Sequence, residues 1–94
     1  MVKKKKHKMQ LTSLLAYADV LENLGERQTE VYRAILELKS CTNKMISDHL
    51  GLAINQVTGR VNELRKEGVV WLHKKDKDPE TGRLVMFWKP RRII

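Results

Sequence analysis

The chain has 94 residues, of which 41% are hydrophobic and 32% charged, and its formal net charge is +8 at pH 7. This length suffices for one domain with a modest core, and no stretch approaches the roughly 18 uncharged apolar residues that a membrane span needs. The lone cysteine, Cys41, excludes an intramolecular disulfide and a cysteine-based metal cluster within one chain. The composition therefore predicts a soluble, unsecreted protein of the reducing cytoplasm.

The positive charge is unevenly distributed along the chain. Residues 1–10 carry five lysines and no acid, residues 11–53 have a net charge of −2, and residues 54–94 have a net charge of +5. A chain polarised in this way is steered in one orientation toward a phosphate backbone or another anionic surface. A solubilising tail is the alternative explanation for the N-terminal lysines.

Apolar residues spaced by three and four predict the first two helices. Residues 11–24 carry such a stripe, with Thr12 or Ser13 as the N-cap. Gly25 interrupts the pattern. Residues 26–39 resume it, with acids in the first turn and a lysine in the last.

A short connector and two further helices follow. Residues 40–42 can pair as a single strand, and Asn43 can cap a third helix that runs to about residue 50 and ends at Gly51. A fourth helix over residues 54–67 has a narrow apolar stripe and stops at Gly68.

β-branched and aromatic residues predict two strands, at residues 69–73 and 83–88. The polar residues 74–82 form the turn between them, in which Asp78 and Gly82 supply turn chemistry. Strand alternation divides the aromatic residues between two faces, so that one is core and another is exposed. These aromatic residues are Trp71, Phe87 and Trp88.

Residues 46–70, ISDHLGLAINQVTGRVNELRKEGVV, resemble the winged helix-turn-helix domains of bacterial, archaeal and phage DNA-binding proteins, including MarR-like regulators. The shared pattern is a Leu-Gly-apolar turn, then a recognition helix ending near Leu-x-x-x-Gly, then an apolar strand. The resemblance extends over residues 24–88. It implies a mainly α fold with a small β-hairpin, in which three to four helices are followed by a two- or three-stranded wing. The residues that match are Leu50, Gly51, Leu52, Val57, Val61, Leu64, Gly68, Val69 and Val70.

The expected organisation is a disordered basic arm at residues 1–10, the winged domain at residues 11–88 and a basic tail at residues 89–94. The arm and tail lack the apolar content to fold. They would add phosphate contacts whose affinity falls steeply with salt, although a nuclear-import signal has the same composition. The arm lysines are Lys3, Lys4, Lys5, Lys6 and Lys8.

The outward face of the fourth helix carries the candidate DNA contacts. Steps of about 100° per residue place amide and cationic side chains opposite the apolar stripe. Asn and Gln bond bidentately to adenine in the major groove, and a helix N-terminus favours phosphate. The base-edge candidates are Asn55, Gln56, Gly59 and Asn62; the phosphate candidates are Thr42, Asn43, Lys44, Thr58, Arg60, Arg65 and Lys66 on the helices, and Lys74, Lys75, Lys77 and Arg83 on the wing.

Alternatives stay open for these candidates. The outward face can be an ordinary polar surface, and the wing lysines can pair with the neighbouring acids rather than with phosphates. Gly59 costs about 1 kcal/mol relative to alanine inside a helix, so it either permits close approach of a groove wall or a partner helix, or is simply tolerated.

Other chemistry has little support. The histidines His7, His49 and His73 lack the spacing of metal ligands, Cys41 is expected to pack as a small apolar residue, and no phosphate loop or nucleophile elbow occurs. The sequence therefore predicts no metal, no cofactor, no small-molecule substrate, no membrane partner and no enzyme activity.

The predicted function is binding of double-stranded DNA, as a cytoplasmic, nucleoid-associated transcriptional regulator or as a mobile-element or replication factor. The alternative is a winged-helix module that docks another protein, since such domains serve both roles, and RNA also stays open. A homodimer through the helix at residues 11–24 would present two recognition helices to a palindromic site.

Overall fold

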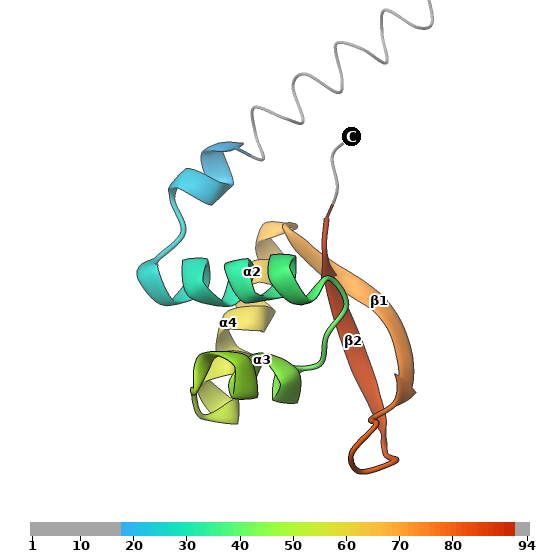
Figure 1. Cartoon of the computed structure of the whole chain (residues 1–94). Helices are drawn as coiled ribbons and strands as arrows, with labels where there is room; N and C mark the ends of the chain where they lie inside the picture. The colour runs from blue at the N-terminus through green and yellow to red at the C-terminus, as the bar shows by residue number, and fades with distance from the viewer. Residues whose placement is uncertain (1–17, 92–94) are drawn as a thin grey trace, which may run out of the picture.

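The computed structural model describes residues 18–91. A short helical segment at residues 18–22 is followed by the elements that Figure 1 labels. The predicted basic arm and most of the helix expected over residues 11–24 lie outside the described residues. No helix in the described part is long and apolar enough to cross a membrane. The labelled elements are α2 (Glu26–Leu38), α3 (Asn43–Leu50), α4 (Ile54–Glu67), β1 (Val70–Lys77) and β2 (Leu84–Pro90).

The three labelled helices gather on one side of the hairpin, whose tip extends beyond them (Figure 1). Their apolar faces and the base of the hairpin form one core, which removes these side chains from water. Tyr32 supplies the least buried side chain of that core. The core consists of Val31, Tyr32, Ala34, Ile35, Cys41, Ile46, Val57, Val61, Leu64, Val69, Val70 and Trp88.

The ends of α3 and α4 follow capping rules. Thr42, and not Asn43 as predicted, is the N-cap of α3, because its hydroxyl accepts a hydrogen bond from the Met45 N–H at 3.1 Å. Gly51 and Gly68 end α3 and α4 with φ of 68° and 80°, in the left-handed conformation that glycine adopts without strain. The predicted bounds of α4 are confirmed at both ends.

Helix α2 ends one residue earlier than predicted because its C-cap, Lys39, leaves the helical conformation. The backbone of Lys39 has φ 71° and ψ −57°, and the Ser40 N–H donates to the Leu38 carbonyl at 2.8 Å. This is a γ-turn with positive φ, which is rare and strained for a residue with a side chain. It turns the chain sharply from α2 into the connector that precedes α3.

The connector is tied to the hairpin by one bridge. Cys41 donates its N–H to the Trp88 carbonyl at 2.9 Å and accepts from the Trp88 N–H at 2.7 Å. The predicted single-strand pairing of the connector is thereby confirmed. Cys41 is fully buried, which agrees with its expected role as a small apolar residue.

The hairpin is longer than predicted. Strand β1 continues to Lys77 and β2 to Pro90, so residues 74–77 belong to a strand rather than to the turn, and the first residues of the expected C-terminal tail pair with β1. The register shifts at a bulge between Leu72 and Lys74. At the tip, the Glu80 N–H donates to the Asp78 carboxylate at 3.0 Å, which confirms the predicted turn chemistry of Asp78.

Candidate nucleic-acid interface

Helix α4 presents one polar face to solvent because its apolar stripe is buried in the core. Val57, Val61 and Leu64 are at most 1% exposed. Asn55 and Asn62, predicted on the opposite face, are both exposed. The 3.6-residue period thus places the predicted base-edge candidates where a ligand can reach them.

The two amides at the start of α4 are partly engaged by the helix itself. The Asn55 side-chain oxygen accepts from the Gln56 N–H at 3.0 Å, and the Gln56 side-chain oxygen accepts from the Ala53 N–H at 3.3 Å. Bidentate recognition of adenine needs both ends of an amide. Asn55 and Gln56 must therefore release these oxygens before they can bind a base in that way.

Asn62 is the least encumbered of the amides on α4. Among the described residues it makes no side-chain hydrogen bond, and it lines a shallow hollow together with Arg65 and Lys66. An amide beside two cations suits a nucleic acid, since bases lie close to phosphates. Asn62 is accordingly the strongest base-edge candidate in the described structure.

Gly59 is not required by packing within the described residues. A Cβ built on Gly59 would meet nothing within 4 Å, whereas Gly51 and Gly68 have positive φ. A methyl group would therefore fit there in the isolated protein. Either the glycine serves an external contact or it is tolerated, as the sequence left open.

The acid on α4 nearest to this face is neutralised. Glu63 accepts from the Gln28 side chain of α2 at 2.9 Å, and Arg60 pairs with its carboxylate at 2.8 Å. The Glu63 charge is therefore held against α2. Because the same contacts occupy Arg60, it is a weaker phosphate candidate than Arg65 or Lys66.

The predicted phosphate candidates at the start of α3 differ in what they can offer. Thr42 is only 4% exposed and its hydroxyl caps α3, so it does not fit the predicted phosphate role. Asn43 donates to the Thr58 hydroxyl of α4 at 3.3 Å. Lys44 pairs with Asp48 one helical turn later, at 2.9 Å. Asn43 and Thr58 therefore mainly join the two helices.

Lys44 also interacts electrostatically with acidic residues of the wing. Its hydrogen bond to Asp48 is the main reason that its pKa is raised, and the acids of the hairpin turn, Glu80 and Asp78, raise that pKa further. Opposite charges stabilise the protonated ammonium. Lys44 thus stays cationic, in a position between α3 and the wing.

The wing lysines fall on both faces of the hairpin. Lys74 pairs with Asp76 at 3.3 Å and lies 5.0 Å from the Phe87 ring centroid. The backbone N–H of Lys77 and the Lys74 side chain lower the pKa of Asp76. Lys75, on the other face, lines a hollow beside α4. Local pairing thus applies to Lys74 and does not extend to Lys75 in the described structure.

An apolar patch that was not predicted from the sequence borders this hollow. Ile54, Leu84 and Met86 are 46%, 71% and 43% exposed, although all three line the same hollow between α4 and the hairpin. Alternation in β2 offered a signal, because Leu84 and Met86 share a face with the buried Trp88. The predicted division of aromatic residues is confirmed, with Trp88 in the core and Trp71 51% exposed.

The described residues contain no cluster of histidine, cysteine and carboxylate side chains suited to a metal ion. Burial raises the pKa of the Cys41 thiol to about 11, so it stays protonated and unreactive at neutral pH.

Curated relatives with similar sequences are named as transcription factors. The chain is 31% identical over 68 residues to Transcription factor E of Saccharolobus islandicus (strain Y.N.15.51), which covers 71% of this chain and 38% of the relative. It is 31% identical over 65 residues to Transcription factor E of Thermococcus kodakarensis, covering 69% of this chain and 35% of the relative. The chain thus spans less than two fifths of these relatives. No family model matches it.

Solved structures with a similar fold include bacterial repressors. The Multiple Antibiotic Resistance Repressor, MarR, superposes with a TM-score of 0.58 at 20% identity, over 97% of this chain and 59% of that one. The adhesin competence repressor of Streptococcus pyogenes gives 0.54 at 20% identity, over 99% and 64%. At this identity the likeness concerns the arrangement of helices and hairpin alone.

Proposed function

We propose that the chain, which has a winged helix-turn-helix fold, binds double-stranded DNA in a transcription-related role. The predicted fold class, mainly α with a small hairpin, is confirmed. The observation that carries the proposal is the exposed face of α4, which is polar and cationic because Glu63 is held against α2. The relatives' names support a role in transcription and offer no support for catalysis.

In the proposed complex α4 lies in the major groove. Asn62 reads a base edge, Asn55 and Gln56 join it after releasing their capping contacts, and Arg65 and Lys66 contact phosphates. The wing lies along the adjacent DNA phosphate backbone and contacts it through Lys75. The basic arm, outside the described residues, adds contacts without sequence preference.

The first test is a salt series with a labelled random-sequence duplex and an equally long single-stranded RNA. We expect duplex affinity to fall linearly on logarithmic axes with salt, and deletion of residues 1–8 to flatten the slope. Lys66→Ala should weaken duplex binding, whereas Arg33→Ala, the same loss of charge on the exposed side of α2, should change it little. Equal losses for both variants, or no duplex binding at low salt, would overturn the proposal.

Base readout needs a separate experiment. Site selection with the wild-type chain should enrich one motif, and Asn62→Ala should relax it at one position at a cost of about 1–3 kcal/mol. Asn55→Ala/Gln56→Ala should relax adjacent positions. Enrichment of no motif by the wild-type chain would limit the protein to sequence-independent binding.

The apolar patch of Ile54, Leu84 and Met86 favours a second candidate function, the docking of a protein on the α4 and wing face. Exposed apolar side chains that gather beside a recognition element often mark a protein interface. The double variant Ile54→Ser/Leu84→Ser separates the two functions. It should retain duplex affinity if the patch serves docking, and lose it if the patch contacts DNA.

A homodimer belongs to the same proposal. The expected interface, residues 11–24, lies mostly outside the described residues, so the dimer is a prediction from apolar spacing. Light scattering at tens of micromolar should give twice the chain mass, and Leu14→Glu/Leu21→Glu should return the monomer. A monomeric wild-type chain would exclude the dimer without affecting the DNA proposal.

A further inference from the structure

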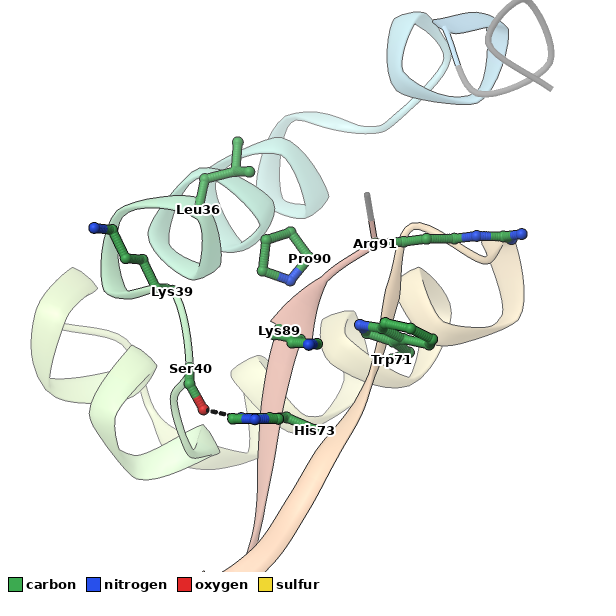
Figure 2. A pocket seen from close by; sticks show the side chains of 8 residues that line it. All are labelled: Leu36, Lys39, Ser40, Trp71, His73, Lys89, Pro90 and Arg91. Atoms are coloured by element: carbon green, nitrogen blue, oxygen red, sulfur yellow. Dashed lines mark hydrogen bonds between the residues drawn. The ribbon is translucent and has the colours of Figure 1, made fainter. Parts of the chain in front are cut away.

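A third hollow lies away from α4, between the C-terminal end of α2 and the hairpin face that carries Trp71 (Figure 2). We call it the basic groove and define it by Leu36, Lys39, Trp71, Lys89, Pro90 and Arg91. Its lining residues do not belong to the α4 and wing face proposed to bind DNA, although Lys89, Pro90 and Arg91 fall in the basic tail expected from the sequence. A role for the basic groove is therefore separate from the proposed DNA interface.

The basic groove has an apolar surface that the core leaves uncovered. Leu36 is 45% exposed and Trp71 is 51% exposed, and Pro90 lies near them at the end of β2 (Figure 2). Trp71 faces the same side of the hairpin as its cross-strand partner, Lys89. Tryptophan is one of the residue types enriched among the side chains that contribute most to binding at protein interfaces.

The charge of the basic groove has one sign. Lys39, Lys89 and Arg91 line it, and no carboxylate of residues 18–91 does. The Lys89 ammonium lies 5.2 Å from the Trp71 ring centroid, so positive charge sits directly beside the apolar surface. A ligand that fits must combine apolar and anionic groups within a short distance.

The groove is also held in shape. The strained γ-turn at Lys39 places the end of α2 at one wall. The His73 ring contacts the Ser40 hydroxyl at 2.6 Å across the lower part of the groove (Figure 2). The Ser40–His73 hydrogen bond joins the connector after α2 to β1 and so links the two walls of the groove.

We propose that the basic groove binds an acidic peptide segment of a partner protein, with an aliphatic or aromatic side chain seated against Leu36 and Trp71 and flanking carboxylates on Lys39 and Lys89. Charge complementarity selects this occupant. The basic segments of this chain are positively charged, as the groove is, and would be repelled from it. A single-stranded nucleic acid fits less well, because Lys89 covers one face of Trp71 and the aliphatic Leu36 offers no stacking surface.

The test uses the full chain and a short fluorescent peptide in which aspartates and glutamates flank a phenylalanine and a leucine. Binding is followed by anisotropy at fixed salt, beside two control peptides. One control keeps the acids and replaces both apolar residues by serine, and the other replaces the acids by their amides. We expect the parent peptide to bind at least about tenfold more tightly than either control.

Variants then locate the site. Trp71→Ser and Lys39→Glu should each weaken peptide binding about tenfold or more, while Leu84→Ser, which removes a still more exposed apolar side chain from the same hairpin, should not. Circular dichroism confirms that each variant is folded, and retained duplex binding by Trp71→Ser and Lys39→Glu separates this site from the DNA interface.

Three outcomes would overturn the proposal. If the serine control binds as tightly as the parent peptide, the interaction is general charge attraction. If Trp71→Ser and Lys39→Glu bind the parent peptide as tightly as the wild-type chain does, the peptide binds elsewhere. Displacement of the peptide by a single-stranded oligonucleotide, together with loss of oligonucleotide binding in Trp71→Ser, would assign the groove to nucleic acid.

Discussion

The Arg65 guanidinium lies over the indole of Trp88, 4.8 Å from the ring centroid, so α4 meets the wing through a cation–π contact. Trp88 is 2% exposed and belongs to the core. One indole thus supports the wing, the core and the position of α4. Changes at Trp88 are therefore expected to affect stability far more than changes at Arg65.

We expect Trp88→Ala to lower the free energy of unfolding by about 3–5 kcal/mol, as for other buried aromatic truncations. Arg65→Ala should cost about 0.5–1 kcal/mol, because the cation–π contact lies at the surface. Urea unfolding followed by circular dichroism measures both. Equal costs for the two variants would contradict the assignment of Trp88 to the core.

Thr42 provides a second test of the fold. Thr42→Ala should destabilise the protein by about 1 kcal/mol because α3 loses its N-cap, whereas Thr42→Ser keeps the hydroxyl and should recover most of that loss. Since Thr42 is buried, duplex affinity of the serine variant should equal that of the wild type. Weaker DNA binding by a fully stable Thr42→Ser would restore Thr42 as a phosphate ligand.

A substitution at Gly59 decides whether this glycine serves DNA binding or is simply tolerated. Gly59→Ala should stabilise the protein by about 1 kcal/mol, because a helical alanine there meets nothing within 4 Å. If α4 approaches a groove wall closely, the same variant should bind duplex DNA about tenfold more weakly. Thermal unfolding and the duplex titration give the two numbers. Higher stability with unchanged affinity would show that the glycine is merely tolerated.

Cys41 predicts a specific pH dependence. Burial raises its pKa from 9.0 to about 11, so the native state holds the thiol proton more tightly than the unfolded state does. Its contribution to stability is complete below pH 9 and is lost as the pH rises toward 11. Unfolding of the wild type and of Cys41→Ala, compared across this range, isolates the effect from the titration of lysine and tyrosine.

The wing lysines should differ in their effect on DNA binding. Lys75→Ala should reduce the salt slope of duplex binding by about one, because Lys75 lines the hollow beside α4 and makes no ion pair within the described structure. Lys74→Ala should have a smaller effect, since Lys74 is paired with Asp76. Identical slopes for the two variants would argue against contact of that hairpin face with phosphates.

Local chemistry explains which elements could be predicted from the sequence. Helix α4 was predicted to the residue because an apolar stripe and Gly68 mark its course and its end. The strand over residues 74–77 was missed because its lysines and aspartate have the composition of a turn. This part of the strand is stabilised by cross-strand pairing with β2, which depends on residues of both strands and cannot be predicted from residues 74–77 alone.

The candidate sites follow the same division. The polar face of α4 could be predicted because one helix carries it, and the 3.6-residue period fixes which side chains share that face. The capping role of Thr42 and the ion pair that occupies Arg60 needed the structure. The basic groove could not be predicted, since it joins the end of α2 to the hairpin through the unusual backbone of Lys39.

The bridge between Cys41 and Trp88, together with the bulge between Leu72 and Lys74, divides the wing into two dynamic regions. Backbone amides at the bridge are buried in the core, so their hydrogen exchange should require global unfolding. Amides beyond the bulge, where β1 is exposed on both faces, should exchange through local opening. The tip is therefore expected to open independently of the base of the hairpin, which stays packed against α3 and α4.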